Sequence, residues 1–555
     1  MNSNPMKLSR RQAIRQTART IAGISLGWVA ATAGHAAGDV ERLKSMPSGA
    51  GKGGLPGVGP ANTLDLPDAE IALAYEKAAT QNVLAAVDAA VFPGYWSVCA
   101  DREGFGRGNT YPSLDGHQLS DALLWLGQED VVKANWDYVR SFQKPNGHLP
   151  IAILPGMKEV SGQAVDANGG LYKHWVPGDP LRALGGTTFI QNADLLFRRT
   201  QDRLWLRAQL PSVNLAADFL ASLTTPEGLV GGAGYYVEFP TRIEFDGVTQ
   251  CHAVDAFRRA AALNRVLGDV RAARRQESLA TRIAKTFLRR FWLDDHFAEY
   301  IHPQRGVVDR HGLTDTNWAA LATGVATARQ REALWPRLRG ETGFYYGGVP
   351  TGIAARPDSY EDWEFSLPNH RHDLASMGRV WYLETWARAR QGDGEGALDT
   401  IRRVASLGRA NGYFWRERYH APTGQPAGPN TYCEYPANLV RIVQRFLLGL
   451  EFQLDGTLTV APVVPSSYWR NGFGHSVTWR ERTLTFRFDR GAMSGSYTGA
   501  GPQRVAVRLE GGNTDVRASI RGAPCRPLVR NGFVLLELPS SFEPSAFVVW
   551  RENSA

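Results

Sequence analysis

Apolar side chains recur at spacings of three and four residues along most of the chain, which is the period of amphipathic helices. One clear stripe runs from Leu279 through Ile283 and Phe287 to Phe291. The pattern predicts twelve helices, at about residues 68–90, 117–127, 130–142, 186–200, 203–224, 250–267, 270–292, 315–326, 329–338, 372–390, 394–409 and 432–449.

The connections between these helices alternate between short and long. The links after the even-numbered helices, such as 268–269 and 392–393, contain two or three residues, whereas those after the odd-numbered helices contain about 20 to 40. Short links place consecutive helices antiparallel, so every long connection lies at the same end of the assembly. We therefore expect six hairpins closed into an (α/α)6 toroid over residues 68–451, with one loop-rich face. An open solenoid of helical pairs is the alternative.

After residue 452 the period of the pattern changes to two. Residues 457–460, 483–488, 505–509 and 533–538 alternate between apolar and polar side chains, and Gly and Asn separate these runs. Such alternation is typical of half-buried strands joined by turns. We expect a C-terminal antiparallel β-sandwich domain over residues 452–555, without a catalytic cluster of its own.

The first 37 residues resemble an export signal. Arg10 and Arg11 form a twin-arginine pair, a moderately apolar stretch follows at 21–33, and small residues surround Gly34 and Ala36. This arrangement predicts recognition by the twin-arginine export machinery and a periplasmic or secreted protein, with an ordinary secretory signal as the alternative. Residues 38–67 are rich in Gly and Pro and are interpreted as a linker.

The charge balance argues against a nucleic-acid partner. The 555 residues carry a formal net charge of +8, but residues 1–37 contain five basic and no acidic residues, which leaves only +3 for the rest. A long-range field that attracts nucleic acid is therefore not expected. No apolar run reaches the length that a membrane-spanning helix needs. The oligomeric state is not predicted.

The sequence calls for no cofactor and no catalytic metal. The four cysteines, Cys99, Cys251, Cys433 and Cys525, fit no zinc-binding spacing and favour buried thiols over disulfides. Phosphate-cradling and dinucleotide-binding motifs are absent from the sequence, and so is an EF-hand-type loop, although a structural calcium ion is left open.

The long connections are rich in aromatic, acidic and arginine side chains. Aromatic faces pack against the apolar faces of sugar rings, and carboxylates and guanidinium groups hydrogen-bond to hydroxyls. The candidate substrate-binding residues are Trp96, Asp101, Arg102, Asp115, Trp175, Tyr236, Trp363 and Trp415.

Two opposed carboxylates can act as acid and base on a glycosidic bond. Glu417, Glu238 and Asp246 are the candidates in these loops. Each also has a structural interpretation: Glu417 lies between two arginines with which it could pair, and Asp246 directly precedes a helix that it could cap. Glu434 begins the last helix, where a carboxylate suits the helix dipole.

Several of these segments resemble the six-hairpin glycosidases. Glu417-Arg418-Tyr419 followed by Thr423-Gly424 resembles the last long loop of trehalase-like and glucosidase-I-like members, and residues 143–150 resemble the segment after their third helix. Residues 455–462 resemble the junction to the β domain in α-L-rhamnosidase-like members. The resemblance covers roughly residues 90–465 and implies that Glu417 is the general base.

The same resemblance implies that the general acid lies in the loop between the fifth and sixth helices. The relatives carry a Trp-Asp segment ending near Ser-Pro-Arg there, and this chain departs from it. Glu238 is the nearest match and Asp246 the alternative.

Together these inferences predict a secreted glycoside hydrolase that inverts the anomeric centre. Glu238 or Asp246 would protonate the leaving oxygen and Glu417 would activate a water, with the two carboxyl groups roughly 6.5–9.5 Å apart. One alternative is a polysaccharide lyase that uses side chains such as Tyr235, Tyr236, His252 and His372. The other is an inactive glycan-binding protein. The sugar, its linkage and the choice between exo and endo action are not predicted.

Overall fold

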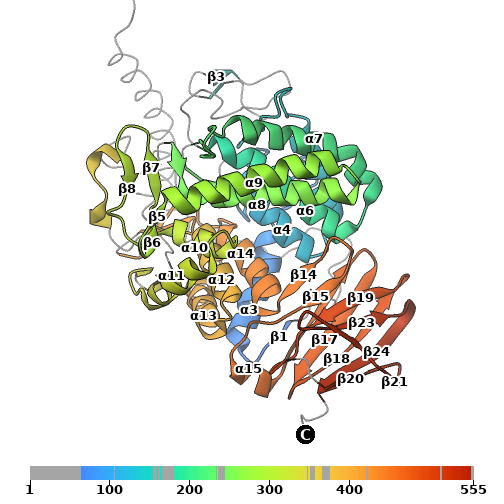
Figure 1. Ribbon diagram of the computed structural model, residues 1–555. Helices are drawn as coiled ribbons and strands as arrows, with labels where there is room; N and C mark the ends of the chain where they lie inside the picture. The colour runs from blue at the N-terminus through green and yellow to red at the C-terminus, as the bar shows by residue number, and fades with distance from the viewer. Residues whose placement is uncertain are drawn as a thin grey trace, which may run out of the picture.

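The computed structural model describes residues 64–104, 107–153, 159–160, 163–164, 181–232, 234–235, 244–346, 348–350, 357–364, 375–420, 423–512 and 515–551. In this part of the chain, a large helical domain is followed by a β domain that packs against one side of it (Figure 1). The predicted export signal, most of the linker, and the candidates Trp175, Tyr236 and Glu238 lie outside the described residues.

Six helices form an inner ring. Each contacts the next one in the ring, and the last contacts the first, so the ring is closed. They are α4 (Leu114–Trp125), α6 (Arg182–Thr200), α8 (Gly247–Val266), α10 (Asp315–Ala322), α12 (Gly378–Arg390) and α14 (Glu434–Ile442).

The other six helices surround this ring. Several start with a side-chain cap directly after the short link: Asp202, Asp269 and Asp393 each accept a hydrogen bond from a backbone N–H in the first turn of the helix they precede. Such caps satisfy donors that the helix leaves unpaired. The outer helices are α3 (Ala69–Lys77), α5 (Glu129–Arg140), α7 (Arg203–Ser222), α9 (Val270–Arg290), α11 (Ala328–Gly340) and α13 (Gly394–Ala410).

The double ring confirms the predicted (α/α)6 toroid and its twelve helices. Two of them end in a π-helical turn, η2 (Ala78–Val83) after α3 and η5 (Val443–Leu447) after α14. The first turns of α4, α6 and α8 begin three or four residues before the predicted starts. Glycine and polar residues, such as Gly116 and Gly185, interrupt the apolar pattern there, so periodicity alone placed these starts too late.

The β domain consists of two sheets, which confirms the predicted C-terminal sandwich. Its ladders are antiparallel except for β15 and β19, which pair in parallel. Two residues of the segment predicted as linker also join it, because β1 pairs with β16. The larger sheet has the order β1 (Leu64–Asp65), β16 (Phe473–Trp479), β17 (Arg482–Asp489), β18 (Ala492–Gly499), β24 (Ser541–Arg551), β20 (Val516–Ile520) and β21 (Ala523–Cys525). The smaller sheet has the order β14 (Leu450–Phe452), β15 (Leu458–Val460), β19 (Gln503–Val507), β23 (Phe533–Leu538) and β22 (Leu528–Arg530).

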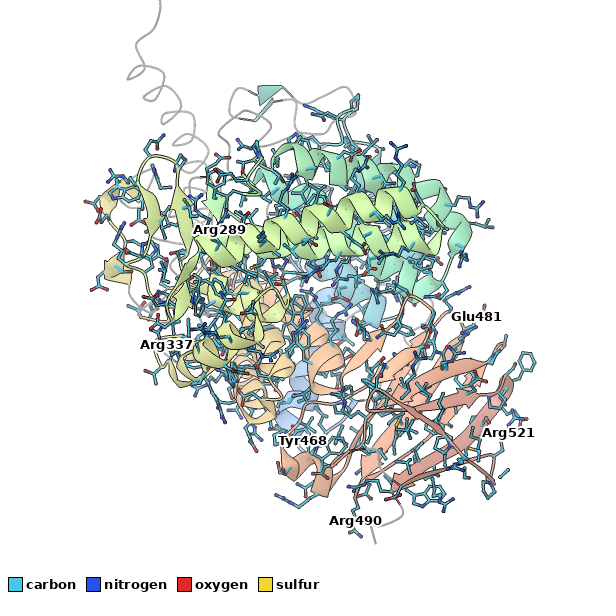
Figure 2. The ribbon with its side chains drawn as sticks, viewed as in Figure 1. Arg289, Arg337, Tyr468, Glu481, Arg490 and Arg521 are labelled. Atoms are coloured by element: carbon cyan, nitrogen blue, oxygen red, sulfur yellow. The ribbon has the colours of Figure 1, made fainter. Side chains whose placement is uncertain are left out.

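Charged side chains lie around the periphery of the β domain, where Figure 2 labels Glu481, Arg490 and Arg521. A short helix, α15 (Ser466–Asn471), leads into its larger sheet. The described part of this domain therefore shows a solvated outer surface and an apolar interior, as expected for a sandwich.

Short strands and turns occupy the long connections, all of which leave the C-terminal ends of outer helices. They are β2 (Glu159–Val160), β3 (Gln163–Ala164), β4 (Phe245–Asp246), β5 (Trp292–Leu293), β6 (His296–Phe297), β7 (Tyr300–His302), β8 (Gly306–Val308), β9 (Tyr345–Tyr346), β10 (Val349–Pro350), β11 (Ala375–Ser376), β12 (Arg418–His420), β13 (Pro426–Ala427), and the 3-10 turns η3 (Pro357–Ser359) and η4 (Asp362–Glu364).

All four cysteines are free thiols, and Cys99, Cys251 and Cys433 are buried. Burial raises the pKa of the Cys251 thiol well above its usual range. Within the described ranges, no helix combines the length and apolarity that crossing a bilayer needs. Nor do those ranges bring together three side chains suited to hold a metal ion.

A buried ion cluster ties α4 to α14 across the inner ring. The Asp121 carboxylate accepts hydrogen bonds from Arg441 Nε at 2.9 Å and from Arg445 Nε and Nη2 at 2.7 Å each. Burial alone would raise the pKa of Asp121, but the two guanidinium groups outweigh it and hold the pKa well below its usual range. The pair of arginines therefore depends on this one carboxylate.

Replacing Asp121 with Asn should destabilise the fold, because it leaves the buried Arg441 and the half-buried Arg445 without their counter-charge. We expect a loss of about 3–5 kcal/mol in the free energy of unfolding, measured by denaturant titration. Asp218→Asn, which removes the surface partner of Arg275, is the matched control and should cost no more than about 1 kcal/mol. Equal losses for the two variants would contradict this interpretation of the cluster.

Candidate active site

A group of carboxylates lies where α4 and α14 begin. Asp115 is in the first turn of α4, Glu434 is the first residue of α14, and Glu417 directly precedes β12. These residues are far apart in sequence, but the parallel inner helices and the β12 strand bring them within electrostatic reach of one another. We refer to Asp115, Glu417 and Glu434 as the carboxylate cluster.

Asp115 has a strongly perturbed carboxyl group. Its side chain keeps some solvent contact, yet protein atoms surround it densely. Burial, together with the charges of Glu434 and Glu417, raises its pKa to about 6, although Arg379 and a hydrogen bond from the Tyr432 hydroxyl act in the opposite direction. The Tyr432 hydroxyl donates to Asp115 Oδ1 over 2.8 Å. A carboxyl group with this pKa can carry a proton near neutral pH.

Glu434 is held by Arg379 in a bidentate ion pair. Arg379 Nε lies 3.0 Å and Nη2 lies 2.6 Å from Glu434 Oε2, and the Arg379 backbone N–H also donates to Oε1. The side chain of Glu434 is fully buried. Glu434 therefore anchors the start of α12 to the start of α14, and Arg379 brings a positive charge close to Asp115.

Glu417 is buried except for 8% of its surface and forms an ion pair with Arg418. A side chain at Gly428, whose φ is +76°, would collide with the Glu417 carboxylate. The glycine thus gives the carboxylate its space beside β13. The predicted pairing with a neighbouring arginine is present. Glu417 is nevertheless buried rather than solvated, and its charge acts on Asp115 within the carboxylate cluster.

Asp246 has the structural role that its position suggested. It is the N-cap of α8, and its Oδ2 accepts hydrogen bonds from the Thr249 N–H at 2.7 Å and from the Thr249 hydroxyl at 3.0 Å. The residue is fully buried. A carboxylate that is enclosed and occupied in this way is poorly placed to protonate a substrate.

The aromatic candidates in the described residues lie in different environments. Trp96 and Trp415 are 2% and 1% exposed, so their rings pack in the core and offer no face to a sugar, which corrects their predicted role. The Trp415 indole also donates to the Val404 carbonyl. Trp363 is partly exposed, with the Arg305 guanidinium 4.1 Å above its ring. Composition alone does not separate such rings from true sugar platforms.

Asp101 and Arg102 form a tight turn close to the cluster. The Asp101 carboxylate accepts from the Glu103 N–H at 3.0 Å, and Arg102 has a φ of +64°, in the left-handed region. The exposed Arg102 side chain lies 3.6 Å from Asp88. Both residues can face a ligand that approaches the cluster from solvent.

A cavity of about 420 Å³ lies along the axis of the inner ring. Leu114 and Arg379 line it next to the carboxylate cluster, and Tyr235 stacks on His252 in its wall with ring centroids 4.4 Å apart. Its volume is in the range of small-molecule sites. The three carboxylates of the cluster do not line this cavity themselves, and its lining continues to the β domain through residues such as Leu450 and Phe533.

A second buried ion cluster holds two of the long connections together. His311 lies between Glu299 and Glu364, with its Nε2 3.0 Å from Glu364 Oε1. The Tyr360 hydroxyl donates to Glu299 and the Tyr300 hydroxyl donates to Glu364. Burial lowers the pKa of His311, but the two carboxylates outweigh it and raise the pKa to about 9. Glu364 is thus a buried structural residue.

Sequence reasoning missed three features of this site. Arg379 and Tyr432 were not singled out, and Asp115 was assigned only a sugar contact. Arg379 opens α12 one residue after its glycine start, which gives no local signal. Acidic residues at the starts of inner helices, such as Asp115 and Glu434, are a pattern that could have pointed to this site and hence to the partners of these carboxylates.

Solved structures share this fold, whereas no protein-family model and no curated protein matches the sequence. The GH78 family rhamnosidase of Bacillus sp. GL1 is 12% identical, with a TM-score of 0.56 over 79% of this chain and 41% of that one. The α-L-rhamnosidase from Dictyoglumus thermophilum is 11% identical, with a TM-score of 0.57 over 88% and 50%. A sialidase is 13% identical, with a TM-score of 0.57 over 77% and 38%.

These likenesses establish the fold. The chain shares its fold, an (α/α)6 toroid with an adjoining β domain, with these α-L-rhamnosidases, as its motifs predicted. It spans half or less of the length of each of these three structures.

Replacing His311 with Asn should remove a pH-dependent part of the stability. The unfolded-state pKa of histidine is about 6.5, so the wild-type contribution is complete below that pH and is lost as the pH rises to about 9. We expect a difference on the order of 3 kcal/mol between wild type and variant at pH 6, shrinking towards pH 9.5, in denaturant titrations. His296→Asn is the control. A difference that does not change with pH would refute the proposed charge state.

Proposed function

We propose that the protein is a glycoside hydrolase in which Asp115 is the general acid and Glu417 the general base. The observation that carries this proposal is the raised pKa of Asp115, about 6, in the same cluster as Glu417. A carboxyl group that can carry a proton near neutral pH, with a second carboxyl group nearby, is what acid–base hydrolysis of a glycosidic bond needs. The toroid fold, shared with the rhamnosidases, supports the same reaction class.

Asp115 takes the acid role that the sequence assigned to Glu238 or Asp246. Asp246 is fully buried, and its Oδ2 accepts the hydrogen bonds that cap α8. Glu238 lies outside the described residues and remains the alternative acid. Asp115, by contrast, is partly accessible to solvent.

The hydrogen bond from Tyr432 suggests how Asp115 delivers its proton. Because the hydroxyl donates to Oδ1, the proton of the acid is best placed on Oδ2, which transfers it to the leaving oxygen. The resulting carboxylate is stabilised by the same hydroxyl and by Arg379. Glu417 accepts a proton from the attacking water. One water attacking from the opposite ring face gives inversion of the anomeric centre.

The substrate in this proposal is an oligosaccharide or a glycan outside the cytoplasm. The twin-arginine pair supports export, and the solvent-facing Asp101 and Arg102 close to the cluster support a ligand with hydroxyl groups. The lyase alternative receives less support, since burial lowers the pKa of His252 to about 4 and its ring is stacked on Tyr235.

Asp115→Asn and Glu417→Gln should each lower kcat by at least about a hundredfold on an oligosaccharide found by screening, because each removes one proton-transfer group. Glu103→Gln, an exposed change in the same loop, is the control and should stay near the wild-type rate. Initial rates of sugar release give the measurement.

A substrate with an acidic phenol as leaving group separates the two roles, since it departs without protonation. Asp115→Asn should regain most of its rate on such an aryl glycoside, while Glu417→Gln should not. The fall in wild-type kcat/KM above about pH 6 should also disappear in Asp115→Asn on this substrate. Full activity of both variants on the oligosaccharide would reject the assignment.

The stereochemistry of the product tests inversion. Proton NMR recorded within the first minutes of hydrolysis should show the anomer opposite to that of the substrate, before mutarotation mixes the two forms. Initial release of the same anomer would instead point to a covalent glycosyl-enzyme. An unsaturated product absorbing in the ultraviolet would identify a lyase, and sugar binding without any turnover would identify a binding protein.

A further inference from the structure

The helix α9 carries more positive charge than the rest of the chain would suggest. It contains seven basic residues and one acidic residue, a net charge of +6, whereas the whole chain after residue 37 has only +3. The small net charge of the chain therefore hides a strong local excess of positive charge on α9. In Figure 1, α9 crosses the front of the helical domain with α8 behind it.

The apolar face of α9 is buried, so the cations face solvent. Ile283 and Phe287 are fully buried in the core. The cations Arg282, Lys285 and Arg289 are exposed and recur at helical spacing, which places them along one side over about 10 Å. We call these three residues the α9 cation row.

The row has few counter-charges among the described residues. The acidic residue of α9, Glu277, forms a bidentate pair with Arg265 of α8. Arg290 is paired with Glu227 at 3.0 Å and Arg275 with Asp218 at 3.0 Å. No carboxylate of the described residues lies within ion-pair distance of the cation row itself, so its charge is available to a ligand.

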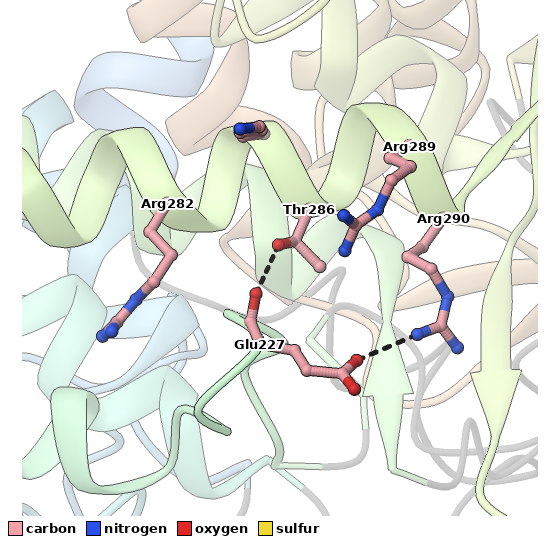
Figure 3. Close-up of a pocket in the computed structure, with 6 residues that line it drawn as sticks. Glu227, Arg282, Thr286, Arg289 and Arg290 are labelled. Atoms are coloured by element: carbon pink, nitrogen blue, oxygen red, sulfur yellow. Dashed lines mark hydrogen bonds and ion pairs between the residues drawn. The ribbon is translucent and has the colours of Figure 1, made fainter.

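The row borders an open hollow of about 550 Å³ (Figure 3). Glu227 fixes the opposite wall: its carbonyl oxygen accepts from the Thr286 hydroxyl at 2.5 Å, and its carboxylate binds Arg290. The hollow thus offers several guanidinium and ammonium donors beside one carboxylate acceptor. Cations bind acidic groups, and the carboxylate can accept from hydroxyls, which is the mixture that an acidic sugar presents.

We propose that the α9 cation row binds an acidic polysaccharide, a polymer that carries carboxylate or sulfate groups on its sugars. This goes beyond the proposed hydrolysis, because binding at α9 requires no turnover. The row lies in the C-terminal part of an outer helix, and outer helices end at the loop-rich face, where the carboxylate cluster also lies. The row and the carboxylate cluster thus lie towards the same face of the toroid, although α9 packs on α8 and the cluster lies at the starts of α4 and α14.

An anionic membrane fits the same charge less well. Helices that lie on membranes bury aromatic or large aliphatic side chains in the lipid. On α9 the one large apolar residue that is exposed is Val270, at the opposite end from the row. The described surface of α9 therefore offers charge without an inserting side chain.

The test compares two triple variants of the full chain with equal loss of charge. One replaces the cation row, Arg282→Ser, Lys285→Ser and Arg289→Ser. The matched control replaces three exposed cations of the β domain, Arg490→Ser, Arg526→Ser and Arg530→Ser. Binding to polygalacturonate, to neutral dextran and to vesicles containing phosphatidylglycerol is measured by titration at low and high salt. Thermal unfolding confirms that both variants are folded.

We expect the wild type to bind polygalacturonate but not dextran, with an affinity that falls as salt increases. The cation-row variant should bind at least tenfold more weakly and with a shallower salt dependence, while the control variant stays within about twofold of wild type. Equal weakening of both variants, no binding to polygalacturonate, or equally tight binding to vesicles would overturn the proposal. Asp115→Asn should bind normally, so failure here and failure of the proposed hydrolysis can be told apart.

Discussion

The six inner helices run in the same direction around one axis, and this common direction is the constraint on which the site depends. Each helix begins with backbone N–H groups that lack intrahelical partners and with the positive end of its dipole. Acidic side chains occupy four of these starts: Asp115, Asp246, Asp315 and Glu434. The ring therefore gathers negative charge at one end, and each carboxylate needs its own compensation.

Much of the fold could be predicted because outer helices and turns leave local signals. An outer helix such as α9 buries one face and exposes the other, so its apolar stripe is visible in the sequence. Inner helices are buried almost all round: in α6 nearly every residue is buried, including polar ones such as Asp194. Periodicity is weak in such a helix, which explains why its existence was predicted well and its start was not.

The site was harder to predict, since its chemistry depends on contacts that sequence spacing does not reveal. Glu417 could be singled out from a motif, but Asp115 owes its raised pKa to burial and to partners more than 300 residues away. Aromatic residues of long loops were similarly ambiguous. Trp96 and Trp415 are core residues because these loops fold back onto the helices and bury their own side chains. Averages also mislead, as the small net charge concealed the basic surface of α9.

Comparison of Asp115 with Glu434 shows how one geometry yields two kinds of carboxyl group. Both begin an inner helix and both lie near Arg379 and Tyr432, although only Glu434 is fully buried. Glu434 places both oxygens on the Arg379 guanidinium and backbone, so it is committed to holding α12 against α14. Within the described residues, the Asp115 carboxyl group accepts a hydrogen bond from the Tyr432 hydroxyl, and the charge of Arg379 acts on it at longer range. The arginine that fixes one carboxylate thus leaves the other undercompensated, and the undercompensated group is the one able to hold and release a proton.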